Sequence, residues 1–405
     1  MQVWLMSLGR LLSQVGTGFT LFFASIYFVN QVGLSATQVG LGLGLMALTG
    51  ILGRLAGGSL SDGAWGRKPT LLAALLVSAT GALALAFAQN FVWFLVANGI
   101  AGLGQGLYWP PAEAIVADLI TREQRNEAFA LSRLGDNLGN SIGVALAGLL
   151  VAATGAFRAL FIIDALTFLV FAGLVVFYIR ETRSAEWRNQ GLLAGWKVAF
   201  SDRYLLIFAA ANIVFTTYIS QLSSSLPLYL NNQVGLSQWI SLLFTLHGLL
   251  IALLQLPVAR WLNGLTRIGG LQISLLGWGL GFAVIGGAGV QSYLGLGLAG
   301  LGLVILSLAL VFYNPSASSL VVDLAPEHLR GVYLSVNSLC WAVGYGIGPV
   351  IGGMVLDLPD PWQHSLWLIW MVSTLGVAAI LQGLARILPN GLRLGLPPLS
   401  EGSLP

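Results

Sequence analysis

The chain has 405 residues, of which 57% are hydrophobic and only 8% are charged. A soluble domain carries about 25% charged residues, so this composition excludes an ordinary soluble globule. The net charge of +3 comes without a run of basic residues and does not indicate a nucleic-acid partner. The one cysteine, Cys340, excludes a disulfide framework and a cysteine metal site.

Apolar runs longer than about 18 residues recur along the whole chain, which predicts membrane-spanning helices. We predict an all-α membrane protein with twelve transmembrane helices in two parallel six-helix repeats. In chain order the predicted spans are 5–30, 37–60, 69–88, 91–116, 128–154, 159–179, 204–230, 238–262, 269–288, 293–322, 332–356 and 364–387. The predicted domains are a first half (1–180), a cytoplasmic linker with an amphipathic segment (181–203), a second half (204–390) and a cytoplasmic tail (391–405).

The basic residues predict the orientation of these spans, because Lys and Arg are retained on the cytoplasmic side. Of the 18 Lys and Arg residues, only Arg158 falls at a predicted outer turn. We therefore expect a multi-pass protein of the cell (inner) membrane with both termini in the cytoplasm.

Two sequence matches show that the halves repeat. The hexapeptide NQVGLS at 30–35 recurs unchanged at 232–237, and VADLITREQR at 116–125 pairs with VVDLAPEHLR at 321–330. The second match aligns Asp118 with Asp323. With an even number of helices in each half, both repeats have the same orientation in the membrane.

The stretch GGSLSDGAWGRKPTLL at 57–72 gathers charge between the second and third predicted spans. Together with GYGIGPVIGG at 344–353 and the matching Asp-to-Arg loops, it resembles the signature motifs of the major facilitator superfamily, in its drug:proton antiporter or multidrug-type branch. The resemblance covers essentially the whole chain. It implies a loop that latches the cytoplasmic side and helix-kink residues in the eleventh span. The implied latch residues are Gly58, Asp62, Gly66, Arg67, Lys68 and Asp118, and the implied kink residues are Gly344, Gly348, Pro349, Gly352 and Gly353.

A glycine at 58 would permit close helix contact, Asp62 could face a helix N-terminus or a cation, and Arg67 could reach Asp118. The alternative is that Arg67 and Lys68 only anchor a short cytoplasmic turn. Two residues depart from the antiporter pattern. Asn98 stands where antiporters carry an arginine, and Val144 replaces their proline.

Ionisable residues inside a span are candidates for function, since an unpaired charge there costs several kcal/mol. Arg133 and Asp136 lie three residues apart on one face of the fifth span and can pair. Protonation of Asp136 could switch this pair, or the pair could be static. Glu113 follows Trp109-Pro110-Pro111 and is the first choice for a proton or cation site. For Asp164 and His247 we favour structural roles.

If the resemblance holds, the first, fourth, seventh and tenth spans line a central cavity. Their polar and aromatic side chains form a mixed pocket that suits an amphipathic molecule better than a polyanion. The cavity candidates are Thr17, Gln105, Tyr108, Trp109, Asn212, Gln221, Tyr313 and Asn314.

The leading hypothesis is a secondary active transporter that works by alternating access and exports small amphipathic compounds with proton coupling. The missing antiporter proline favours the alternative, an uptake symporter or facilitator for a small metabolite. An alternative of another class is a non-transporting membrane sensor, although a sensor should carry a sizeable output domain. No convergent catalytic set, metal cluster or phosphate-binding loop indicates an enzyme or a cofactor. The expected partners are a small-molecule substrate, protons and the lipid bilayer, and we expect a monomer.

Overall fold

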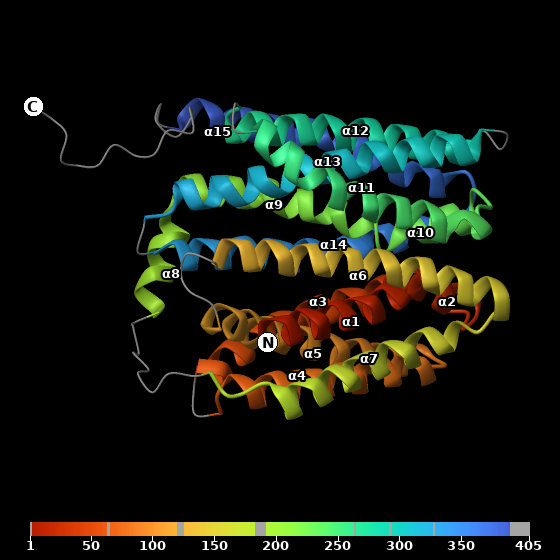
Figure 1. The fold of residues 1–405 in the computed structure, drawn as a ribbon. Helices are drawn as coiled ribbons and strands as arrows, with labels where there is room; N and C mark the ends of the chain where they lie inside the picture. Colours follow the sequence, from red (N-terminus) through yellow and green to blue (C-terminus); the bar gives the residue numbers. More distant parts are fainter. Residues whose placement is uncertain are drawn as a thin grey trace, which may run out of the picture. The chain divides into compact units, whose positions relative to one another are not determined.

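The computed structural model describes residues 2–62, 65–119, 125–182, 192–262, 265–290, 294–326 and 329–388. Throughout these ranges the chain is helical or in turns, without strands (Figure 1). Twelve helices or helix pairs among them are long and apolar enough to cross a membrane. The predicted fold class and number of spans are confirmed.

Seven helices form the first half. They are α1 (Gln2–Leu21), α2 (Phe23–Asn30), α3 (Ala36–Asp62), α4 (Arg67–Phe87), α5 (Phe91–Asp118), α6 (Arg125–Thr154) and α7 (Phe157–Tyr178). Local signals set several of these ends. The Asn90 side chain accepts a hydrogen bond from the Trp93 N–H at the start of α5, as an N-cap does. Gly155, with φ +65°, follows the end of α6 in the left-handed conformation that glycine favours.

The remaining elements are α8 (Leu192–Ser201), α9 (Arg203–Gln221), α10 (Ser225–Asn232), η1 (Ser237–Trp239), α11 (Ile240–Trp261), α12 (Arg267–Val290), α13 (Gly295–Leu324), α14 (Arg330–Leu356), η4 (Trp362–His364) and α15 (Ser365–Ile387). The helix α8 lies within the predicted linker. The first span of each half is broken, at Phe22 between α1 and α2 and at residues 222–224 between α9 and α10. These breaks fall at equivalent places of the repeat, and sequence analysis predicted neither.

Contacts divide the chain into two compact units. The first unit comprises Met1–Arg188, Gln221–Leu249 and Tyr345–Leu358, and the second comprises Asn189–Ser220, Leu250–Gly344 and Pro359–Pro405. The first unit therefore includes α10, the beginning of α11 and the end of α14 as well as α1 to α7. The division at residues 181–203 that sequence analysis expects stays a prediction.

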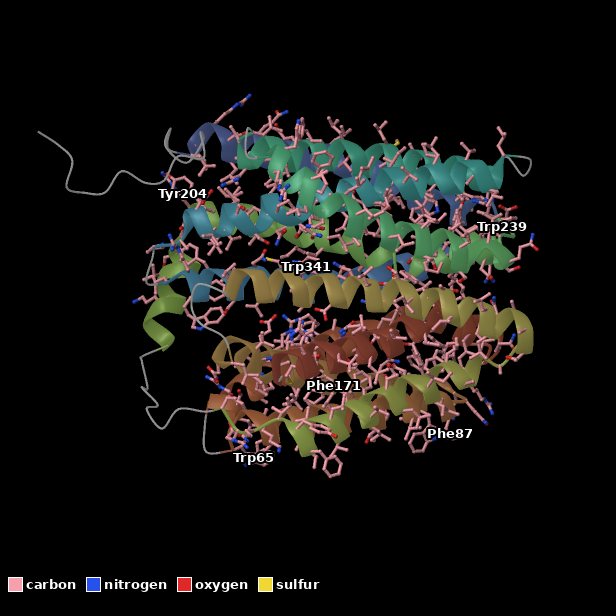
Figure 2. All side chains as sticks on the ribbon, viewed as in Figure 1. Trp65, Phe87, Phe171, Tyr204, Trp239 and Trp341 are labelled. Carbon is pink, nitrogen blue, oxygen red and sulfur yellow. The ribbon has the colours of Figure 1, made fainter. Side chains whose placement is uncertain are left out.

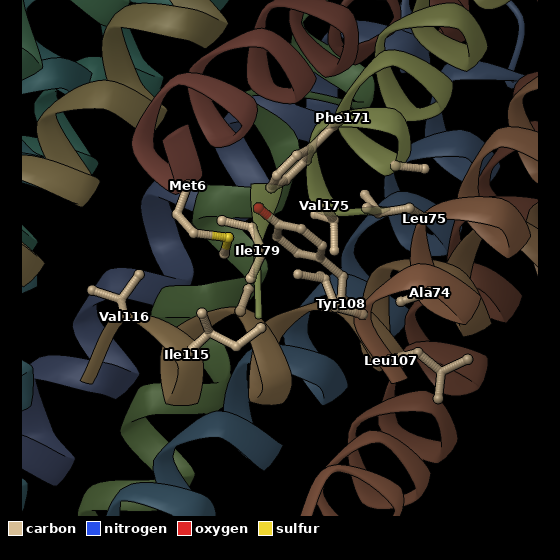
Figure 3. Close-up of a cluster of buried hydrophobic side chains, with 13 residues drawn as sticks. Met6, Ala74, Leu75, Leu107, Tyr108, Ile115, Val116, Phe171, Val175 and Ile179 are labelled. Carbon is tan, nitrogen blue, oxygen red and sulfur yellow. The ribbon is translucent and has the colours of Figure 1, made fainter. Parts of the chain in front are cut away.

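The interior of the first unit contains a cluster of buried apolar side chains from α1, α4, α5 and α7. Figure 3 shows Met6, Tyr108, Phe171 and Val175 in this cluster, and all four side chains are less than 5% exposed. Lipid is as apolar as these side chains, so close packing, rather than removal of apolar surface from water, holds such helices together.

Glycines allow a close helix approach between α3 and α5. A Cβ atom on Gly106 would lie 2.8 Å from the Gly53 Cα, and one on Gly57 would lie 2.8 Å from the Leu107 carbonyl oxygen. A Cβ on Gly58 would meet no described atom within 4 Å. The expectation that Gly58 marks a close helix contact stays a prediction. Its neighbour Gly57 faces α5. Adjacent residues of a helix point about 100° apart, so Gly57 and Gly58 do not face the same helix.

Candidate functional site

A buried ion pair joins α1 to α6 in the first unit. The Arg10 Nη2 lies 2.6 Å from the Asp136 Oδ2, and the Arg10 Nε donates to the Asp136 Oδ1 at 3.3 Å. Both residues are buried, Arg10 with only 2% of its surface exposed. The two-point contact compensates charges that would be costly in the interior of a membrane protein if either stood alone.

The helix α5 supplies the surroundings of this pair. The Arg10 Cζ lies 5.4 Å from the centroid of the Trp109 ring, within the range of a cation–π contact. The Tyr108 side chain is buried beside it, and Glu113 lies about one turn further along α5 than Trp109. The Nη1 of Arg10 is buried without a hydrogen-bond partner among the described residues. Side chains that sequence analysis selected on α5 and α6 thus gather around one arginine.

Arg10 itself was missed by sequence analysis, which counted it with the cytoplasmic basic residues. Its position more than a turn inside the first apolar run was the available signal. The side chain of Arg133 lies outside the described residues, so its pairing with Asp136 stays a prediction.

The second unit carries an uncharged network on the corresponding helices. The Tyr313 hydroxyl donates to the Asn212 Oδ1 at 2.6 Å, and the Asn212 Nδ2 donates to the Asn337 Oδ1 at 2.8 Å. The sequence repeat aligns Arg10 with Asn212, and Tyr108 with Tyr313. The position of Arg10 therefore carries a neutral amide in the second half, where the partner Asn337 aligns with Ser132 and not with Asp136.

The other cavity candidates lie in different surroundings. Thr17 donates to the Ser13 carbonyl oxygen at 3.1 Å, Gln105 is exposed, Gln221 is fully buried and Asn314 is half-buried. The candidates are divided between the two units. Their arrangement around a common cavity stays a prediction.

The loop before α4 brings the motif residues together with two carboxylates. Arg67 forms an ion pair with Asp118 at the end of α5, and its Nη1 also donates to the Ala114 carbonyl oxygen at 3.3 Å. Lys68 donates from its Nζ to the Val176 carbonyl oxygen at 2.9 Å. The side chain of Asp62 lies outside the described residues. In the second unit the Arg267 Nε lies 3.0 Å from the Asp323 Oδ2, at the place where the repeat aligns Asp323 with Asp118.

Glu181 caps the N-terminus of α4, a role that sequence analysis considered only for Asp62. The Glu181 carboxylate accepts hydrogen bonds from the backbone N–H groups of Arg67, at 3.0 Å, and Lys68, at 3.1 Å. Gly66 precedes them with φ +91°, and a Cβ there would lie 2.6 Å from a Glu181 oxygen. A carboxylate at this place also interacts favourably with the helix dipole.

We expect Glu181→Gln to lower the free energy of unfolding by about 0.5–2 kcal/mol, because the first N–H groups of α4 lose a charged acceptor. Thermal unfolding in detergent measures the change. Arg180→Gln is the control, since it alters the charge of the adjacent exposed residue without touching the cap. Equal melting temperatures for the two variants would rule out the cap.

The N-terminus of α3 is also capped by a carboxylate, that of Asp357, which follows α14. The Asp357 carboxylate accepts the backbone N–H groups of Ala36 and Thr37, each at 2.8 Å. Nearby, the Asn30 and Asn232 side-chain amides donate to each other at 2.8 and 3.0 Å. These two asparagines begin the two copies of NQVGLS, so the repeated hexapeptide pairs with itself in the first unit.

Partial burial would raise the pKa of Asp357. Hydrogen bonds from Thr37, Ala36 and Ser35 outweigh this effect and hold the pKa below its ordinary value. A carboxyl group with a lowered pKa stabilises the structure above its ordinary pKa and loses this effect as the pH falls through the lowered value. We expect amide hydrogen exchange at the start of α3 to be slower in the unmodified protein than in Asp357→Asn near neutral pH. The two rates should converge at acidic pH, and a difference that persists unchanged there would contradict the assignment.

The fold and the charged cluster define a polytopic membrane protein of the transporter class. The chain belongs to the Major Facilitator Superfamily, whose family model matches residues 6–311 and 237–393. It is 27% identical over 365 residues to the multidrug resistance protein MdtH of Escherichia coli O9:H4 (strain HS), covering 89% of this chain and 87% of that protein. MdtH of Salmonella arizonae is 27% identical over 347 residues, covering 82% of this chain and 81% of that protein.

Solved structures share the fold at low sequence identity. The nucleoside transporter NupG superimposes with a TM-score of 0.79 at 14% identity, over 95% of this chain and 99% of NupG. A bacterial homologue of the human lysosomal transporter Spinster, in an inward-facing and unoccupied conformation, gives a TM-score of 0.78 at 15% identity, over 95% and 96% of the two chains. The matched proteins are transporters and not enzymes.

Proposed function

We propose that the protein is a secondary active transporter that exports small amphipathic compounds in exchange for protons, by alternating access. The buried Arg10–Asp136 pair carries this proposal, because a titratable carboxyl group paired with an arginine inside a membrane-spanning unit can respond to a proton gradient. The similarity to proteins named for multidrug resistance supports the export of amphipathic compounds. We propose both termini to be cytoplasmic and the working form to be a monomer.

Proton coupling would act through the partners of Arg10. When Asp136 takes up a proton, its negative charge is lost and Arg10 loses its main counterion. Glu113, about one helical turn beyond Trp109 on α5, is then the next carboxylate along that helix. A proton thus changes which contacts stabilise α1 against α5 and α6, and this difference can bias an equilibrium between two conformations.

The contacts at the start of α4 and those at the start of α3 would form and break in alternation. The Arg67–Asp118 pair and the Glu181 cap hold one end of the first unit. The Asp357 cap and the Asn30–Asn232 pair hold the other end. Opening a path at either end requires loss of the contacts there, so these polar groups would set the relative stability of the two states.

A facilitator or uptake symporter is the second candidate, favoured by Asn98 and Val144 at positions where antiporters carry arginine and proline. Transport in proteoliposomes with an imposed pH gradient, against a panel of amphipathic cations and neutral metabolites, decides between them. Accumulation of a compound against the proton flow supports export. Equilibration that ignores the gradient supports the facilitator, and movement of no compound under any gradient would contradict transport.

A further inference from the structure

A pocket of about 600 Å³ lies in the first unit where three chain segments meet. Tyr27 and Gln31 line it from α2 and the turn that follows, Gln89 from the turn between α4 and α5, and Phe157 and Arg158 from the start of α7. The volume falls in the range of about 300–1,000 Å³ that is typical of small-molecule sites. The Arg10 cluster contributes no residue to this pocket.

Arg158 is held in the pocket by only part of its guanidinium group. Its Nε donates to the Tyr27 hydroxyl at 3.1 Å. The Tyr27 ring stacks on Phe157, with centroids 6.0 Å apart and an angle of 22° between the planes. This contact fixes the direction of the arginine and leaves its two Nη groups without a described ion pair or hydrogen bond. These groups can present a planar, two-point donor to an anion.

The lining segments contain no acid that could neutralise this charge. Residues 22–35, 85–95 and 150–160 include no aspartate or glutamate, and Arg158 is their only charged residue. The glutamine side chains at 31 and 89 add neutral amide donors. The pocket therefore has a net positive charge with an aromatic wall, which suits a single anionic group attached to a larger molecule.

The position of the pocket along the helices indicates where that molecule comes from. Phe87 and Trp93 lie on either side of Gln89 in the sequence, with 68% and 62% of their surfaces exposed, and Figure 2 labels Phe87 at this end of the first unit. Exposed aromatic residues at the ends of spanning helices are typical of the membrane–water interface. In a bilayer the phosphate groups of phospholipids lie at this interface, which is the depth we expect for Arg158.

We propose that this pocket binds the phosphodiester headgroup of a glycerophospholipid, with Arg158 holding the phosphate and Gln31 and Gln89 contacting the polar headgroup. By the orientation expected from the basic residues, the bound lipid belongs to the outer leaflet. The site would tie α2, α5 and α7 to the bilayer at the end of the unit where the two NQVGLS segments meet.

Native mass spectrometry of the detergent-purified protein, titrated with dioleoylphosphatidylglycerol, tests the proposal. We expect Arg158→Gln to weaken lipid binding about tenfold, the effect of losing one charge-assisted contact. Tyr27→Phe keeps the ring but removes the oxygen that orients the arginine, so it should weaken binding by a smaller factor. Arg180→Gln, at the opposite end of α7, is the matched control and should bind the lipid as the unmodified protein does.

Dioleoylglycerol, which lacks the phosphate, and inorganic phosphate, which lacks the lipid, provide two further arms. Neither should displace the phospholipid if the site recognises both parts. Equal lipid affinities for Arg158→Gln and Arg180→Gln would overturn the proposal. Displacement of the lipid by inorganic phosphate alone would also overturn it, and would assign the pocket to a free anion.

Discussion

Neutralising either member of the Arg10–Asp136 pair is expected to destabilise the protein, and neutralising both is expected to restore stability without restoring proton coupling. Arg10→Gln leaves a buried carboxylate and Asp136→Asn leaves a buried guanidinium, each without its main counterion. Breaking a buried pair in this way costs about 3–5 kcal/mol. The double variant replaces the pair with two amides, the chemistry that Asn212 and Asn337 already provide in the second unit.

Thermal unfolding in detergent and transport driven by a pH gradient measure the two effects separately. The single variants should unfold at lower temperatures, the double variant should recover most of the loss, and all three should lack gradient-driven transport. Asp323→Asn is the control, because the Arg267–Asp323 side chains are 26% and 30% exposed, so loss of this pair should cost less than loss of the buried pair. A double variant that transports with the normal dependence on pH would show that the pair is static and that protons act elsewhere.

The positions of the spans and the repeat could be predicted because both are local properties of the sequence. An apolar run of sufficient length predicts a spanning helix whatever its neighbours are, and NQVGLS can be matched without knowledge of the fold. The partner of Asp136 required tertiary information. Arg10 and Asp136 are 126 residues apart, and only the packing of α1 on α6 brings them together.

A signal for that packing was present in the glycines of α6. A Cβ on Gly139 would lie 2.7 Å from the Leu11 carbonyl oxygen, and one on Gly143 would lie 2.8 Å from the Gly18 Cα. These two glycines, spaced four residues apart, form the small-residue surface that lets α1 approach closely. Their position three and seven residues after Asp136 indicated that a neighbouring helix should supply its partner.

The uncertainty between Gly57 and Gly58 and the omission of Glu181 have different physical causes. Two consecutive glycines in one helix point in different directions, so the sequence GG at 57–58 does not specify which of them faces α5. Glu181 follows α7 and reaches the start of α4 across more than 110 residues of chain. Capping patterns in the sequence identify acceptors within a few residues of the helix they cap, so they could not find this one.

Gly106→Ala in α5 is expected to lower stability even though alanine is the better helix former. A Cβ atom at this position would lie 2.8 Å from both the Gly53 Cα and the Arg54 backbone nitrogen of α3. Backbone atoms cannot rotate away as a side chain can, so the two helices must separate along their closest line of contact. Overpacking of this kind typically costs about 1–3 kcal/mol, and valine at the same position should cost more because its branched side chain is larger.

Gly99→Ala provides the matched control on the same helix. A Cβ there would lie 3.8 Å from the nearest described atom, the Cδ2 of Leu45, which is an ordinary van der Waals distance. Gly99→Ala should therefore be neutral or raise stability by up to about 1 kcal/mol through helix propensity alone. Thermal unfolding of both variants in detergent separates the two effects, since propensity acts equally at both sites and the collision acts only at Gly106. Equal melting temperatures for the two alanine variants would contradict the predicted collision between a Cβ atom at position 106 and the backbone of α3.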